Sequence, residues 1–145
     1  MYKHLLIATD GSELALKAVD QGLKLGRMLS AKTTVVTVTE PWTMVAPGEI
    51  GMTIPIDDYE SGVAEHAKNI LDAAQKQAET AGIACEFLHV RDRYPADGIL
   101  EAAKSLGCDL IVMASHGRRD VARLLIGSQA NRVVTYSPIP VLICK

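Results

Sequence analysis

The sequence predicts an α/β protein built on an open, five-stranded parallel sheet with helices on both faces. Short apolar or β-branched runs, typical of strands covered on both faces, recur along the chain. Longer segments with apolar residues at helical spacing separate them, and this alternation implies right-handed crossovers and parallel strands. At 145 residues the chain fits one domain, which we expect to span residues 1–145.

The first helix is expected between two buried strands. Residues 5–8 (Leu-Leu-Ile-Ala) predict the first strand, and residues 33–39, all of them β-branched, predict the second. Ser12 is placed to cap the helix between them. That helix carries Gly22 and Gly26 on its apolar face. Because glycine is unfavourable inside helices, close packing on the sheet best explains both.

The remaining elements follow from the same periodicities and from glycine and proline positions. Residues 41–58 are rich in proline and glycine and predict a loop of a length usual for functional flaps or partly disordered segments. After it we expect a helix over 59–81 ended by Gly82, a strand over 84–90, a helix from Pro95 to Gly107, a strand over 109–113, a helix after Gly127 and a last strand over 140–144.

Composition excludes several classes of function. A net charge of −2 and a pI near 6.1 give no support for binding nucleic acid or an anionic membrane. No segment approaches the roughly 20 apolar residues of a membrane span, and no signal peptide is evident, so we expect a cytoplasmic protein. The three cysteines and four histidines are scattered without metal-ligand spacing, which predicts buried thiols and no metal site.

Chemistry is expected where strands one, two and four end, because ligands of open parallel sheets bind beyond the carboxyl ends, where the strand order reverses. After strand four the chain has Gly117, and then Gly127-Ser128 at a helix start. Backbone N–H groups at a glycine turn and at a helix N-terminus form an anion site. Ser128 adds a hydroxyl donor, and Arg118 or Arg119 could add positive charge.

Four segments together resemble the universal stress protein family: Ile7-Ala-Thr-Asp-Gly-Ser12, residues 109–119, Gly127-Ser128 and residues 137–143. The match runs nearly end to end and weakens only at 41–58 and 91–94. The resemblance implies a Rossmann-like sheet of the adenine nucleotide α-hydrolase type. In the nucleotide-binding branch it also implies a phosphate loop, G-x2-G-x9-G-[S/T]. That loop falls here on Ala114, Gly117, Gly127 and Ser128, so the first glycine is an alanine.

The resemblance also implies roles for individual residues toward a bound ATP or AMP, with or without Mg²⁺. Gly117, Gly127 and Ser128 would hold the phosphates, with the backbone N–H of Gln129, and Asp10 would contact the nucleoside. The lining of the adenine and ribose pocket would be Ala8, Thr9, Val38 and Met113. From their position in the loop, His116, Arg118 and Arg119 join Ala114 as further candidate contacts.

Each assignment has a structural alternative. Asp10 would also suit a helix cap, since the N-terminal dipole favours a carboxylate. Val38 and Met113 fit an ordinary core, and the arginines fit a solvated face. His116 has no partnering nucleophile or carboxylate motif, which favours a loop or ligand contact over catalysis. At position 114, a positive φ would strain alanine by roughly 1–2 kcal/mol, whereas a negative φ makes it harmless.

The function expected from these features is that of a binding and signalling module in which the nucleotide orders residues 41–58 or 117–127. The chain lacks a GxxxxGK[ST] loop and paired carboxylates for magnesium, so we do not expect an enzyme, although slow ATP hydrolysis stays open. The alternative is a stress scaffold that has lost nucleotide binding and acts through protein partners. An adenylate-forming or α-hydrolase enzyme would need a catalytic loop that Asp10-Gly-Ser12 does not resemble.

The last strand, residues 140–144, predicts a homodimer. An apolar strand at the edge of a sheet is a liability unless it is paired. Pairing with the same strand of a second copy across a two-fold axis would cover both edges. The family resemblance implies the same arrangement.

Overall fold

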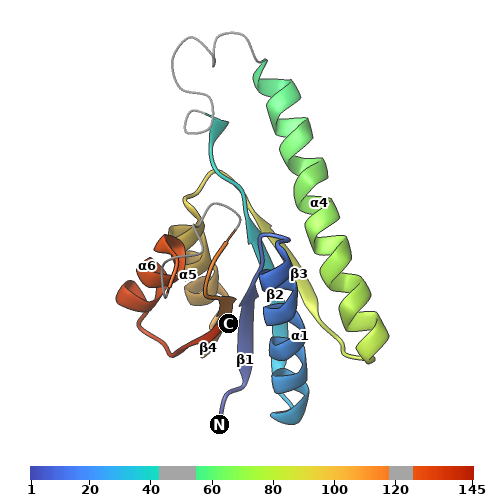
Figure 1. Cartoon of the computed structure of the whole chain (residues 1–145), viewed down its shortest axis with the longest axis vertical. Coiled ribbons are helices and arrows are strands. Elements are labelled where there is room, and N and C mark those ends of the chain that lie inside the picture. Colours follow the sequence, from blue (N-terminus) through green and yellow to red (C-terminus); the bar gives the residue numbers. More distant parts are fainter. Residues whose placement is uncertain (43–54, 118–125) are drawn as a thin grey trace.

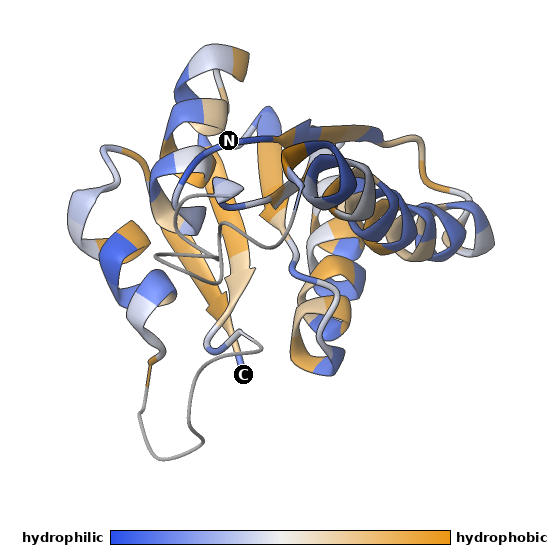
Figure 2. Cartoon of the chain, turned by 90° about the horizontal axis from the view of Figure 1, so that it is seen from above, coloured by the Kyte–Doolittle hydropathy of each residue, from blue (hydrophilic) through white to orange (hydrophobic). Residues whose placement is uncertain are grey.

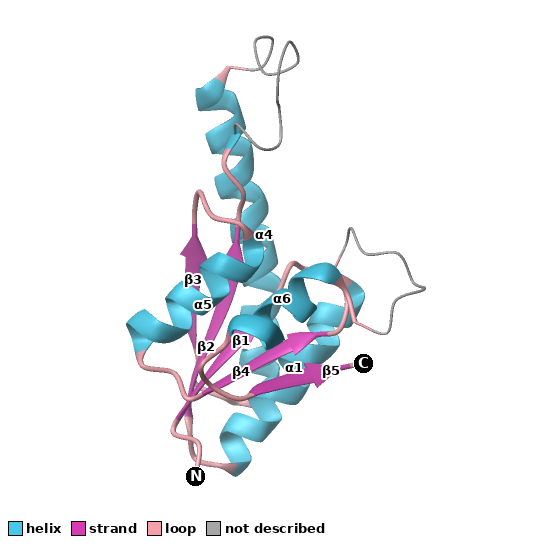
Figure 3. Cartoon of the chain, turned by 90° about the vertical axis from the view of Figure 1, so that its left-hand side faces the viewer, coloured by secondary structure: helices cyan, strands magenta, loops and turns pink. Residues whose placement is uncertain are grey.

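A computed structural model describes residues 1–42, 55–117 and 126–145, and these form a five-stranded parallel sheet with helices on both faces (Figures 1 and 3). The strand order is β3-β2-β1-β4-β5, and every neighbouring pair is parallel. This confirms the predicted fold class. The elements in chain order are β1 (His4–Ala8), α1 (Glu13–Met28), β2 (Lys32–Val38), α4 (Ile56–Ala81), β3 (Glu86–Val90), α5 (Pro95–Leu106), β4 (Leu110–Ala114), α6 (Ser128–Tyr136) and β5 (Val141–Cys144).

Two apolar cores lie on the two faces of the sheet. Because successive strand residues point to opposite faces, Leu5 and Ile7 of β1 pack with residues of α1 and α4. Leu6 and Ala8 pack with residues of α5 and α6. Figure 2 shows the apolar strands lying between the helices. The sheet is therefore buried on both faces, as the short apolar runs predict.

Helix α1 packs closely on the sheet through its two glycines. A Cβ atom added to Gly22 would lie 2.7 Å from Cδ1 of Ile7, and one added to Gly26 would clash with Cγ2 of Thr33. Real Cβ atoms essentially never come so close to another heavy atom. The prediction that close packing explains both glycines is confirmed.

Local sequence sets most of the helix ends. The Ser12 hydroxyl accepts the N–H of Ala15 at 3.2 Å and caps α1. Gly82 and Gly107 end α4 and α5 in the left-handed conformation, with φ of +65° and +67°, where glycine has no steric cost.

Several element boundaries differ from the sequence prediction, by one to three residues. Helix α4 begins at Ile56, so the last residues of the predicted loop over 41–58 are helical, with Asp57 and Asp58 in the favourable first turn. Asp109 lies just before β4, and its carboxylate accepts the N–H groups of Lys3 and His4. Strand β3 begins at 86 instead of 84. Residues 43–54 of the loop lie outside the described residues.

The three cysteines are free thiols, of which Cys108 and Cys144 are buried and Cys85 is half-buried. Burial raises the pKa of all three, that of Cys108 to about 11. They are thus largely protonated at neutral pH and weakly reactive. Across the described ranges, every helix is too short or too polar to cross a membrane.

Candidate functional site

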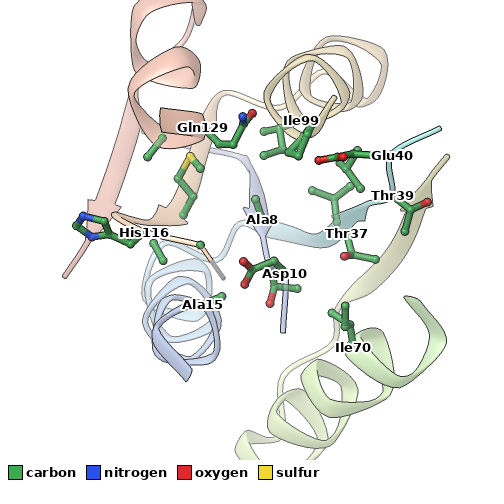
Figure 4. Close-up of a pocket in the computed structure, with 18 of the residues that line it drawn as sticks. Ala8, Asp10, Ala15, Thr37, Thr39, Glu40, Ile70, Ile99, His116 and Gln129 are labelled. Atoms are coloured by element: carbon green, nitrogen blue, oxygen red, sulfur yellow. The ribbon is translucent and has the colours of Figure 1, made fainter. Parts of the chain in front are cut away.

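A cavity of about 430 Å³ opens at the carboxyl edge of the sheet (Figure 4). It lies where β1 has β2 on one side and β4 on the other, which is the point where the strand order reverses. Its walls come from the ends of these strands and from α1, α4, α5 and α6. The sequence-predicted residues on this lining are Ala8, Thr9, Asp10, Val38, Met113, Ala114, His116, Gly117, Ser128 and Gln129.

One end of the cavity, here called the α6 end, is formed by the end of β4 and the start of α6. The Gly127 N–H donates to the Ser115 carbonyl at 2.6 Å, which fixes the start of α6 against the end of β4. Gly117 and Ser128 consequently line the same cavity. Gly127 is the N-cap of α6 and brings no side chain to that position. The first-turn amides of a helix lack intrahelical acceptors, so this end can receive an anion.

Gly127 is buried and does not line the cavity, and its own N–H is used within the chain. Any donors of this turn therefore come from the residues that follow it. Arg118 and Arg119 lie outside the described residues.

Ala114 is the last residue of β4, and its φ is not positive. It is buried and packs in the core with residues of α1. Of the two possibilities for this position, the unstrained one therefore holds. The alanine that replaces the family's first glycine carries no backbone strain.

Asp10 lies near the middle of the cavity, where the turn from β1 to α1 presents it (Figure 4). Its Oδ1 accepts the Ser12 N–H at 2.9 Å, and Gly11 makes the turn with a φ of +78°. Ser12, not Asp10, caps α1. The Asp10 carboxylate thus stabilises the turn between β1 and α1 and also lines the cavity.

His116 follows β4 at the α6 end, and its ring lies at the margin of the cavity, pointing away from Ala8 and Asp10 (Figure 4). Its Nδ1 and the hydroxyl of the buried Ser115 are 3.0 Å apart. This contact holds the imidazole in place. It is a loop position of the kind that sequence reasoning favoured over a catalytic base.

The opposite end, here called the α4 end, is formed by the end of β2 and the N-terminal half of α4, which extends beyond the carboxyl ends of the strands (Figure 1). The lining residues here that sequence reasoning missed are Thr37, Thr39, Glu40, Tyr59, Val63, His66 and Ile70. The sequence predicts that the end of strand two contributes to the site, so Thr39 and Glu40 could have been included on that ground. The α4 residues recur at helical spacing and looked like ordinary core positions.

Two contacts tie the α4 end together. The Tyr59 hydroxyl donates to the Glu40 carbonyl at 2.9 Å and joins α4 to the end of β2. The Thr39 hydroxyl lies 2.8 Å from Nε2 of His89 on β3. Burial lowers the pKa of His89, and the nearby charge of Arg91 lowers it further. A neutral imidazole is therefore favoured beside this end of the cavity.

Gln129 contributes its side chain as well as its position in the first turn of α6. Its Oε1 accepts the Ala96 N–H at 3.1 Å, across to the start of α5. Sequence reasoning assigned only the backbone N–H of this residue. The starts of α5 and α6 are thus coupled at the cavity wall.

Histidine, cysteine and carboxylate side chains are spread over the described part of the chain. Within residues 1–42, 55–117 and 126–145, no three histidine, cysteine or carboxylate side chains come together to hold a metal ion. The absence of a metal site from the whole chain stays a prediction.

The chain was compared with known proteins. The model of the universal stress protein family matches residues 1–145. A universal stress protein of Thermus aquaticus is 32% identical, with both chains covered completely. The solved structure of MJ0577 from Methanocaldococcus jannaschii superposes with a TM-score of 0.82 at 27% identity, covering 100% of this chain and 96% of the other.

A second solved structure is described as a universal stress protein in complex with cAMP. It superposes with a TM-score of 0.70 at 27% identity, covering 99% of this chain and 97% of that one. The match of the family model, the similarity of complete sequences and the shared sheet all point the same way. The chain belongs to the universal stress protein family.

Proposed function

We propose that this chain binds an adenine nucleotide, ATP or AMP, and serves as a homodimeric binding and signalling module in the stress response. The observation that carries the proposal is that Gly117 and the first turn of α6 line one cavity at the reversal of the strand order. A phosphate fits the α6 end, because backbone amides and the helix dipole both favour an anion there.

The rest of the cavity suits a nucleoside. Its volume of about 430 Å³ lies within the range of small-molecule sites. Val38, Ile99 and Met113 offer apolar contact for the faces of a base. The Asp10 carboxylate is an acceptor for ribose hydroxyls. An end suited to an anion, a polar middle and an apolar wall match the groups of a nucleotide.

The relative that is described with cAMP supports an adenine-bearing ligand, because it shares this fold over nearly its whole length. cAMP contains adenine, ribose and a phosphate. The arrangement of the cavity in this chain suits the same three groups.

The module is proposed to act by binding and not by catalysis. The competing function is a scaffold that has lost nucleotide binding and acts through protein partners. Ordering of residues 41–58 or 117–127 by the nucleotide stays a prediction, since most of these residues lie outside the described ranges. The cytoplasmic location also stays a prediction.

Binding is tested by thermal unfolding and calorimetry of the purified chain with ATP, ADP and AMP. A ligand that binds the folded state must stabilise it by mass action and so raise the melting temperature. At a ligand concentration of 100 times the Kd, the free energy of unfolding rises by about 2.7 kcal/mol. Trp42 fluorescence provides a second signal in the same titration. Flat calorimetry at millimolar nucleotide would leave the scaffold as the better account.

Dimerisation is proposed through β5. This strand is at one edge of the sheet, is entirely apolar apart from its cysteine, and leaves Leu142 39% exposed. Val134 and Tyr136 at the end of α6 are also exposed large side chains. Pairing of β5 with β5 of a second copy would cover this edge.

We expect Leu142→Lys to give monomers, because it places a charge in the proposed interface. Light scattering after size exclusion measures the mass. Ala84→Lys adds the same charge next to the other edge strand, β3, and should leave the dimer intact. A stable dimer of the Leu142→Lys variant would remove β5 from the interface.

A further inference from the structure

We propose that the Gln129 side chain is a specificity-determining contact that links the ligand's phosphate to the start of helix α5. In this arrangement its Oε1 caps α5 while its Nε2 donates to a phosphate oxygen. The inference rests on the proposed nucleotide binding and adds to it a side chain whose role neither the phosphate-loop pattern nor the comparisons assign.

Helix α5 depends on Gln129 for its N-terminal cap. The N-cap residue, Tyr94, makes no side-chain capping bond, and Pro95 at the first helical position has no N–H. The next amide is that of Ala96, which donates to Oε1 of Gln129 at 3.1 Å. The two residues are 33 positions apart in the sequence, so this bond holds the starts of α5 and α6 together.

The same bond fixes which way the amide group is turned. A backbone N–H can only donate, so the oxygen of the Gln129 amide must face Ala96. The nitrogen is consequently directed elsewhere, and it forms no hydrogen bond with another described residue. Because Gln129 lines the cavity, with its amide on the wall beside α5 and Ile99 (Figure 4), the N–H donors of Nε2 are available to a ligand.

The electrostatics of the cavity assign these donors to the phosphate. Gln129 directly follows Ser128 in the first turn of α6, where an anion is favoured. The other lining groups include the carboxylates Asp10 and Glu40, which disfavour a phosphate in the middle and at the α4 end. A hydrogen bond to a charged oxygen is roughly twice as strong as one between neutral groups.

The experiment compares Gln129→Glu, Gln129→Met and Asn131→Asp with the unmodified chain, using AMP and adenosine in calorimetry and thermal unfolding without ligand. The Gln129→Glu variant keeps an acceptor for Ala96 but exchanges the N–H donors for a carboxylate oxygen. We expect its affinity for AMP to fall at least about tenfold and its affinity for adenosine to change less than about twofold. Its melting temperature should stay the same or rise, since a carboxylate suits both helix starts.

Asn131→Asp controls for charge alone, because Asn131 is an exposed residue of the same helix and does not line the cavity. It should weaken AMP binding by less than about threefold. Gln129→Met removes both the cap and the donors. It should therefore lower the melting temperature and also weaken AMP binding.

Three results would overturn the inference. Equal AMP affinity in Gln129→Glu and the unmodified chain would show that Nε2 does not contact the phosphate. Equal losses for AMP and adenosine would place the contact on the nucleoside. An unchanged melting temperature in Gln129→Met would contradict the capping role. An unmodified chain that binds neither AMP nor adenosine would instead overturn the proposed function itself.

Discussion

The two ends of the cavity are built in different ways. The α6 end is made of the end of β4 and the start of α6, which the Gly127 N–H joins by its bond to the Ser115 carbonyl, and its chemistry comes from backbone amides at the start of α6. The α4 end is made of side chains from β2 and from a helix that overhangs the sheet, and the Tyr59 hydroxyl bond to the Glu40 carbonyl joins them. We therefore expect the α6 end to be sensitive to charge and the α4 end to be sensitive to packing and side-chain hydrogen bonds.

The largest expected effect comes from a charge at the α6 end. Ser128→Asp places a carboxylate where the phosphate is proposed, and we expect AMP affinity to fall by roughly 2 kcal/mol, or about 30-fold. Adenosine affinity should hardly change. Stability should not fall, because an acidic residue in the first turn favours the helix. Calorimetry with AMP and adenosine measures both affinities. An equal loss of affinity for the two ligands would show that the α6 end does not bind the phosphate specifically.

A smaller effect on ligand affinity is expected when a hydroxyl group is removed at the α4 end. Tyr59→Phe removes the donor to the Glu40 carbonyl, so α4 is held less firmly against the end of β2. We expect calorimetry to show both AMP and adenosine binding more weakly by about 0.5–1.5 kcal/mol. Tyr2→Phe is the matched control, because Tyr2 precedes β1 and does not line the cavity. A loss of affinity for AMP alone would indicate that the phosphate binds at the α4 end and not at the α6 end.

The smallest effect on binding is expected at Ala114. Ala114→Gly restores the glycine of the family's loop, but the alanine is unstrained and its side chain packs in the core with α1. We expect nucleotide affinity to stay within about twofold and stability to fall by roughly 0.5–1 kcal/mol, since glycine weakens a strand. Chemical denaturation and calorimetry measure the two quantities. A tenfold gain in affinity would show that the methyl group crowds the ligand.

The α6 end was largely predictable because its information is local. Gly117, Gly127 and Ser128 follow a buried strand and precede a helix, and such a sequence places amides at the carboxyl edge whatever the rest of the chain does. Ser12, Gly82 and Gly107 set helix ends for the same reason. Local predictions of element boundaries were less accurate: the last residues assigned to the loop before α4 are helical, and β3 begins two residues later than predicted.

The contribution of α4 to the cavity could not be predicted, because tertiary packing and the bond of Tyr59 to the Glu40 carbonyl bring this helix to the end of β2. The helical spacing of Tyr59, Val63, His66 and Ile70 defines one face of α4 but not what that face meets. The Gln129 contact with Ala96 likewise links helices through residues that are distant in the sequence. The periodicity of apolar residues in the sequence does not specify contacts between residues that are this far apart.

The amino-acid sequence by itself determined the order of strands and helices, the buried faces of both and the turn chemistry at the end of β4, since each depends on neighbouring residues. Only the tertiary structure decided that α4 overhangs the carboxyl edge and that Gln129 caps a second helix. The physical reason is that these features depend on how helices seat across the sheet, where many side chains contribute together and no single stretch of chain specifies the outcome.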